Sequence, residues 1–159
     1  MPIRVRWRSK EYIPYAFMLM GACGSFQLLF IFIAQYFLGI GNYLIVILMP
    51  IIAAVGLYFG STIIFEAFAQ VERRKKLKTQ FNKSKGDLSM IQRFLQFQVV
   101  KPLLISFIPF TALFFISYFV SIAFFDNLIS FLIAENFSTL VCLLIANLFE
   151  KNYAKVRRY

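Results

Sequence analysis

Long apolar runs, separated by short polar stretches, are the main pattern along the chain. No charged residue occurs between Glu11 and Glu66, and the sequence "GIGN" at 39–42 is the only turn-like cluster in that interval. A hydrocarbon core about 30 Å thick is crossed by roughly 20 helical residues, so the interval has room for two membrane spans. The pattern therefore predicts a first span over about 13–38 and a second over about 43–65.

The second half of the chain has the same arrangement of two apolar runs around a short turn. A third span is predicted over about 102–125 and a fourth over about 128–149, with the polar pair Asp126–Asn127 between them. The chain then divides into a basic tail (1–12), a first hairpin (13–65), a basic loop (66–101), a second hairpin (102–149) and a basic tail (150–159). The predicted fold class is an all-α integral membrane protein with four transmembrane helices in two hairpins.

The basic loop over 66–101 is predicted to be helical near both of its ends. The sequence "FEAFAQVERRKKLKTQF" contains no Gly or Pro, so the second span should continue as a helix beyond the membrane. Further on, "LSMIQRFLQFQVV" places Leu88, Ile91 and Leu95 at helical spacing, opposite a polar side. This pattern predicts an amphipathic helix at the membrane interface that leads into the third span.

The distribution of basic residues predicts the orientation of the spans. All 17 Lys and Arg residues lie in the tails or in the basic loop. The positive-inside rule places the N-terminus, the C-terminus and this loop on one side, the cytoplasm or an organelle matrix. Basic side chains at span ends also bind anionic headgroups, and we expect this contact from Arg73, Arg74, Lys75, Lys76, Arg157 and Arg158. Nucleic-acid binding is not expected, because it would need a folded basic domain with base-stacking aromatics.

Composition supports a membrane protein without identifying the membrane. Hydrophobic residues make up 60% of the chain and charged residues 15%, against about 25% charged residues in a soluble domain. The Arg-rich segment before Glu11 suits a mitochondrial address, yet positive-inside anchoring explains the same residues. We expect an integral protein of the mitochondrial inner membrane or of a bacterial plasma membrane.

The residue types on which most enzymes depend are missing or isolated. The chain has no His, and its two cysteines, Cys23 and Cys142, fall in different spans without CxxC spacing. We find no nucleophile–base set, phosphate-binding Gly-rich loop or metal-ligand cluster in the sequence. We therefore expect a protein that is not an enzyme and has no metal or cofactor, although a structural phospholipid could bind to its apolar surface.

One acid lies inside a predicted span. Glu135, with Asn136 beside it, is seven residues from the outer end of the fourth span and hence roughly 10 Å deep. An ionised carboxylate without a partner is costly at this depth, and every Lys and Arg lies on the opposite side. Its partner must then be a cavity water, a residue of another subunit, or a polar group of this chain such as Gln35, Ser117, Tyr118 or Ser121. Glu135 is predicted to be either a protonated hydrogen-bonding group or one half of a contact between subunits.

Small residues form a second candidate contact on the second span. Gly56 and Gly60 make a GxxxG pair, with Ala53 three residues before it. Small residues on one helix face allow close approach of another backbone. We expect packing within the chain against the first span, where Gly21 and Gly24 offer a small surface, and a neighbouring subunit is the alternative.

Two stretches resemble a receptor family. "YFGSTIIFEAF", the basic loop and "LSMIQRFLQFQVVKPLLISFIPF" are similar to the fifth span, third loop and sixth span of nematode serpentine chemoreceptors, over about a third of the chain. The resemblance implies a receptor of seven spans, whereas this sequence predicts four. The last span also lacks the Tyr-Pro pair that such receptors tend to carry.

Three functions follow from these patterns. The one we favour is a non-catalytic, multi-pass accessory or structural subunit of a larger membrane complex, for example of the respiratory or ATP-synthase type. Its partners would be other membrane subunits and anionic lipids. The alternatives are a small oligomeric channel or transporter that uses Glu135, and a truncated receptor related to the serpentine family.

Overall fold

The computed structural model describes residues 13–78 and 99–153, except for the side chains of 71–78 and 153. The elements are α1 (Ile13–Phe32), a π-helical segment η1 (Ile33–Phe37), α2 (Tyr43–Lys78), α4 (Val100–Ser121) and α5 (Asn127–Tyr153). Four helical stretches are long and apolar enough to cross a membrane: Ile13–Phe37, Tyr43–Gln70, Val100–Ser121 and Asn127–Asn152. The prediction of an all-helical chain with four such helices is confirmed for the described residues.

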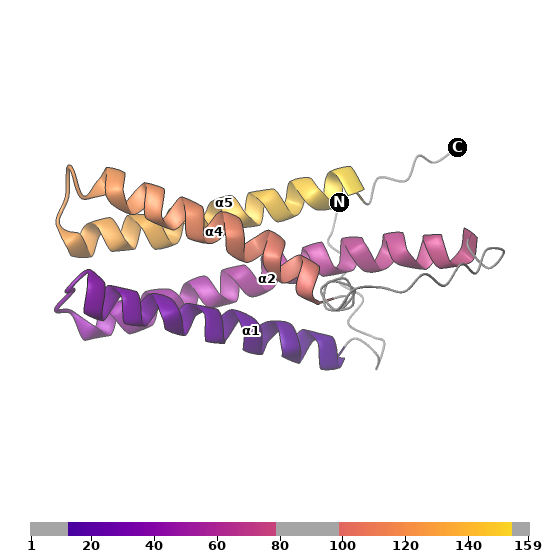
Figure 1. Ribbon diagram of the computed structural model, residues 1–159, viewed down its shortest axis with the longest axis horizontal. Helices are drawn as coiled ribbons and strands as arrows, with labels where there is room; N and C mark the ends of the chain where they lie inside the picture. Colours follow the sequence, from indigo (N-terminus) through magenta and orange to yellow (C-terminus); the bar gives the residue numbers. More distant parts are fainter. Residues whose placement is uncertain (1–12, 79–98, 154–159) are drawn as a thin grey trace, which may run out of the picture.

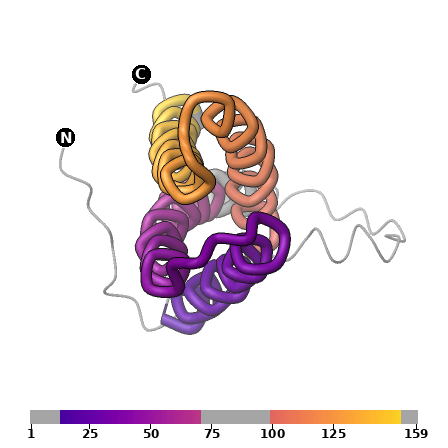
Figure 2. The backbone as a smooth tube through the Cα atoms, turned by 90° about the vertical axis from the view of Figure 1, so that its left-hand side faces the viewer, coloured from indigo at the N-terminus to yellow at the C-terminus, as the bar shows by residue number. Residues whose placement is uncertain are grey.

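The four helices lie side by side as a bundle, with both short connections at the same end (Figure 1). The end-on view shows α2 between α1 and α5, with α4 next to α5 (Figure 2). The contacts of α5 are shared mainly between α2 and α4, whereas α1 packs mainly against α2. Helix α2 also extends beyond the other helices at the end away from the turns. The predicted amphipathic helix and most of both basic tails lie outside the described residues.

The connection between α1 and α2 is closed by backbone hydrogen bonds at a glycine. Gly39 has a φ of 61°, a backbone conformation that glycine adopts at no steric cost. The N–H of Leu38 donates to the carbonyl of Ile33 at 3.1 Å, and the N–H of Ile40 donates to that of Ala34 at 3.2 Å. These bonds satisfy carbonyls at the helix end and reverse the chain within a few residues.

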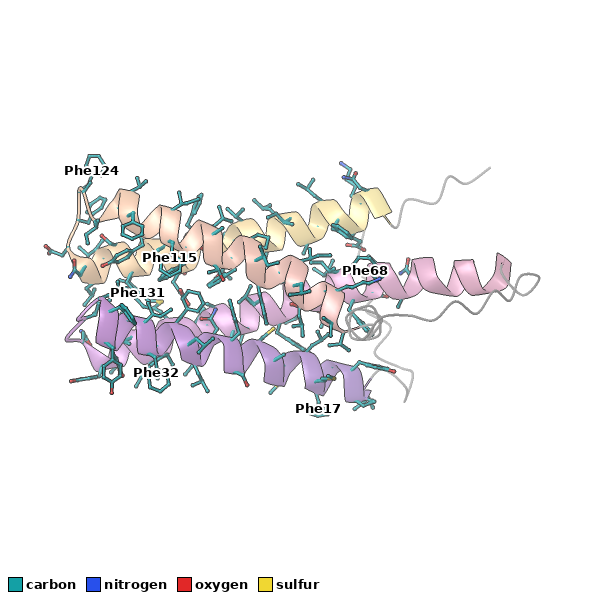
Figure 3. All side chains as sticks on the ribbon, in the orientation of Figure 1. Phe17, Phe32, Phe68, Phe115, Phe124 and Phe131 are labelled. Atoms are coloured by element: carbon teal, nitrogen blue, oxygen red, sulfur yellow. The ribbon has the colours of Figure 1, made fainter. Side chains whose placement is uncertain are left out.

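Aromatic rings from three helices fill the turn-side half of the core. Phe30 of α1 contacts Phe114 of α4 edge to face, with ring centroids 4.7 Å apart. Phe114 in turn contacts Phe131 of α5 at 5.9 Å. Other phenylalanines face outward, and Figure 3 shows Phe17 and Phe32 at the outer edge of the bundle. An apolar surface of this kind suits hydrocarbon surroundings and not water.

Candidate intramembrane polar site

Glu135 lies inside the bundle, on the face of α5 that is turned toward the other helices. Its side chain is 1% exposed. It follows the start of α5 at Asn127 by eight residues, so it is about 12 Å along the helix. Neither carboxyl oxygen has a hydrogen-bond partner among the described residues. Thr139 donates to Glu135, but to its backbone carbonyl, at 2.8 Å.

Gln27 of α1 is a second buried polar side chain of the same kind. It is 2% exposed, and both its Nε2 and its Oε1 lack a hydrogen-bond partner within the described part of the chain. It precedes the end of the first apolar stretch at Phe37 by ten residues, or about 15 Å. Gln27 and Glu135 therefore lie within about one helical turn of each other along the bundle.

The partners that we expected for Glu135 within the chain do not reach it. Gln35 lies in η1, two residues from the end of the first apolar stretch. Tyr118 lies one turn from the end of α4 and stacks on Phe114, with ring centroids 6.3 Å apart. Ser117 and Ser121 also lie in that last turn region, and none of the four hydrogen-bonds the carboxyl group. The expectation was wrong for these residues because all of them lie nearer the turns than Glu135.

A layer of four small polar side chains crosses the bundle deeper in, and the sequence pattern did not reveal it. Cys23 of α1 lies 3.8 Å from Ser61 of α2, sulfur to oxygen. The Ser61 hydroxyl donates to the Ser106 hydroxyl of α4 at 3.1 Å. The thiol of Cys142 on α5 donates to the Ser106 carbonyl at 3.6 Å. This serine–cysteine layer joins all four helices through the kind of polar contact that holds helices together in membranes.

The small face of α2 packs against α5. A Cβ atom added at Gly56 would overlap the methyl group of Thr139, and one added at Gly60 would lie 3.8 Å from the Cβ of Ala146. Ala53 is buried on the same helix. We expected the first span as the partner, and this was wrong for the two glycines. Helical spacing identifies a small face but not the helix that lies against it.

Asn136 points outward, although its neighbour Glu135 points inward. Consecutive residues of an α-helix are turned by about 100° from one another, which allows this separation. The Asn136 side chain is exposed, and its Nδ2 donates to the Leu132 carbonyl at 2.8 Å. The same Nδ2 lies 3.9 Å from the sulfur of Met49, so the amide borders the seam between α5 and α2.

The side chains of the basic residues that we expect to bind headgroups are not among those that the structure describes. Arg73, Arg74, Lys75 and Lys76 belong to the far end of α2, where only the backbone is described, and Arg157 and Arg158 lie outside the described residues.

The chain matches no protein-family model, no curated protein and no solved structure. Fold and site together define a class: a helical protein with four apolar helices long enough to span a membrane and one deeply buried acid.

Proposed function

We propose that the protein is a non-catalytic, multi-pass subunit of a larger membrane complex, and that it binds its neighbours through the outer face of α5 around Asn136. The observation that carries the proposal is an exposed amide at membrane depth. Asn136 follows Asn127 by nine residues, about 14 Å along the helix. Its Oδ1 accepts no hydrogen bond from the described residues.

A polar group at this depth is costly when it faces lipid, because hydrocarbon offers no donor. A neighbouring helix with an N–H or O–H group would satisfy the Oδ1 of Asn136. Ile133 and Leu140, which are exposed one turn to either side, would provide the apolar contact around that bond. Polar contacts between membrane helices contribute about 0.6–2 kcal/mol each, enough to favour one partner surface over lipid.

The chain offers a matched control for this role. Asn147 is also exposed on α5, and it follows Asn136 by 11 residues, about three turns, so it lies on the same face. It is, however, only five residues from the end of the apolar stretch at Asn152, where headgroups and water can satisfy it. Asn136 and Asn147 therefore differ mainly in depth.

The experiment compares Asn136→Leu with Asn147→Leu in native membranes. Each tagged variant is cross-linked, solubilised gently and analysed for stoichiometric partner subunits. We expect Asn136→Leu to lose the partners and Asn147→Leu to retain them, with equal amounts of folded protein. Equal retention by both variants, or a wild-type protein that forms only oligomers of itself, would contradict the proposal.

The placement in the membrane that fits this function has both turns on one side and the basic segments on the other. Support comes from the arrangement of the bundle, whose two turns lie at one end, and from the positions of the 17 basic residues in the sequence. In this placement the end of α2 around Arg73–Lys76 contacts anionic headgroups, as do Arg157 and Arg158. The membrane would be the mitochondrial inner membrane or a bacterial plasma membrane.

A small oligomeric channel or transporter is the second candidate. One observation favours it, namely that the buried carboxyl group of Glu135 has no partner among the described residues. Glu135→Gln separates the two functions, because glutamine keeps the shape of the side chain but cannot ionise. Normal assembly together with lost ion flux would replace the subunit proposal by transport.

A further inference from the structure

Two side chains in the bundle interior present polar atoms that the described protein does not use. Glu135 contributes two carboxyl oxygens, and Gln27 contributes one oxygen and one NH₂ group. Both residues are at least 98% buried. Each buried polar group without a hydrogen bond lowers the stability of the folded state by about 1–3 kcal/mol. Such groups in a protein core therefore indicate a function or a bound partner.

The serine–cysteine layer gives an independent measure of their relative depth. Cys23 and Cys142 both contact this layer, so they mark one level on α1 and α5. From that level toward the turns, Gln27 is four residues away and Glu135 seven, which correspond to about 6 Å and about 10 Å. The two side chains again lie about one turn apart, inside the same core.

The chemistry around Glu135 fits a proton better than a metal cation. Ca²⁺ takes about six to eight oxygen ligands, and monovalent cations also need several. In the described residues, no group of three or more His, Cys, Asp and Glu side chains could hold a metal ion. The hydroxyl of Ser138, three residues further along α5, donates to the carbonyl of Ala134 at 2.6 Å and not to the carboxyl group of Glu135. A proton needs only one carboxyl oxygen.

No formally charged side chain of the described residues shares the level of Glu135. The other titratable groups that the packed helices contribute to the core are thiols and phenols: Cys23 on α1, Tyr58 on α2, Tyr118 on α4 and Cys142 on α5. The charged groups lie toward the ends of the bundle: Glu66 on α2, Lys101 on α4, Asp126 in the turn, and Glu150 and Lys151 on α5. A neutral carboxylic acid is therefore the form that this core accommodates.

We infer that Glu135 is an internal proton-binding site and that Gln27 is the second polar group of this site. The inference does not rest on the subunit proposal, because it concerns the bundle interior and not the outer face around Asn136. The bundle would hold one exchangeable proton about a third of the way along α5.

Infrared difference spectroscopy of the whole protein in lipid bilayers tests the binding site. The spectrum of the wild type minus that of Glu135→Gln at neutral pH should contain the C=O band of a neutral carboxylic acid. Asp126→Asn, which removes an exposed acid, should leave this band in place. Gln27→Leu should shift the band, because the surroundings of the carboxyl group become less polar. If Glu135→Gln does not fold, Glu135→Asp should shift the band without abolishing it.

Transfer of the wild type into D₂O tests whether the bound proton exchanges. Deuteration should shift the acid band of Glu135 to lower frequency, and an unshifted band would contradict an exchangeable proton. A carboxylate band at Glu135 that changes when Na⁺ is replaced by choline would overturn proton binding in favour of a metal cation.

Discussion

Gly56 and Gly60 belong to one GxxxG pair, yet they should respond in opposite ways to the same substitution. At Gly56, an added methyl group would overlap the methyl of Thr139 on α5. At Gly60, the nearest atoms are 3.8 Å away, which is ordinary van der Waals contact. We therefore expect Gly56→Ala to destabilise the bundle and Gly60→Ala to be neutral or stabilising.

The magnitude follows from the geometry around Thr139. Its Oγ1 donates to the Glu135 carbonyl at 2.8 Å, and a β-branched side chain has few alternative rotamers, so it cannot simply turn away. Overpacking of this kind costs about 1–3 kcal/mol, while replacing Gly by Ala inside a helix contributes about 0.5–1 kcal/mol of stability. The net effect of Gly56→Ala is then a loss of about 1 kcal/mol. Gly60→Ala should gain about 0.5 kcal/mol, because only the helix term applies.

Reversible unfolding in mixed micelles, followed by circular dichroism, measures both variants on the same scale. The difference of about 1.5 kcal/mol corresponds to roughly a tenfold change in the unfolding constant. Thr139→Ser removes the overlapping methyl and keeps the hydroxyl, so it should restore most of the stability lost in Gly56→Ala. Equal stability of Gly56→Ala and Gly60→Ala, or no recovery in the double variant, would refute the packing of this face on α5.

Two further predictions concern orientation and the serine–cysteine layer. A reporter fused after Tyr159 and one within 73–85 should both lie on the side of the membrane that carries the basic residues, and a reporter at Gly41 should lie on the opposite side. If the reporters after Tyr159 and within 73–85 lay on different sides, the four-span topology would be contradicted. Ser106→Ala removes the hydroxyl that links α2 to α4 and should lower stability by about 0.6–1 kcal/mol in the same unfolding assay. Ser138→Ala is its control, since that hydroxyl bonds only within α5, and equal losses in the two variants would argue against the layer.

The helices could be predicted from the sequence because the solvent imposes them. In hydrocarbon every backbone group must be bonded internally, so an apolar run of sufficient length becomes a helix whatever its neighbours are. The turn at Gly39 could be located because "GIGN" is the only turn-like cluster between Glu11 and Glu66. In the structure Gly39 has the positive φ that favours glycine. The continuation of α2 to Lys78 followed from a stretch without helix breakers.

The contacts between helices could not be predicted in this way. Each span is apolar on all sides, so periodicity does not identify the inward face as it does in a soluble bundle. For that reason the partner of Gly56 was assigned to the wrong helix, and the contact between Ser61 and Ser106 was not anticipated. The depth of a residue in a span can be counted along the sequence. The direction in which its side chain points can be determined only when the packing of the helices is known.

Glu135 and Asn136 show why that direction matters for function. The sequence presents them as one polar pair, and both were candidates for the same contact. Because one residue turns the helix by about 100°, α5 directs the acid into the core and the amide toward the surroundings. Substitution of Asn136 should therefore affect association without altering the acid band of Glu135. Substitution of Glu135 by Gln should affect that band without altering association, so α5 can serve two independent roles with adjacent residues.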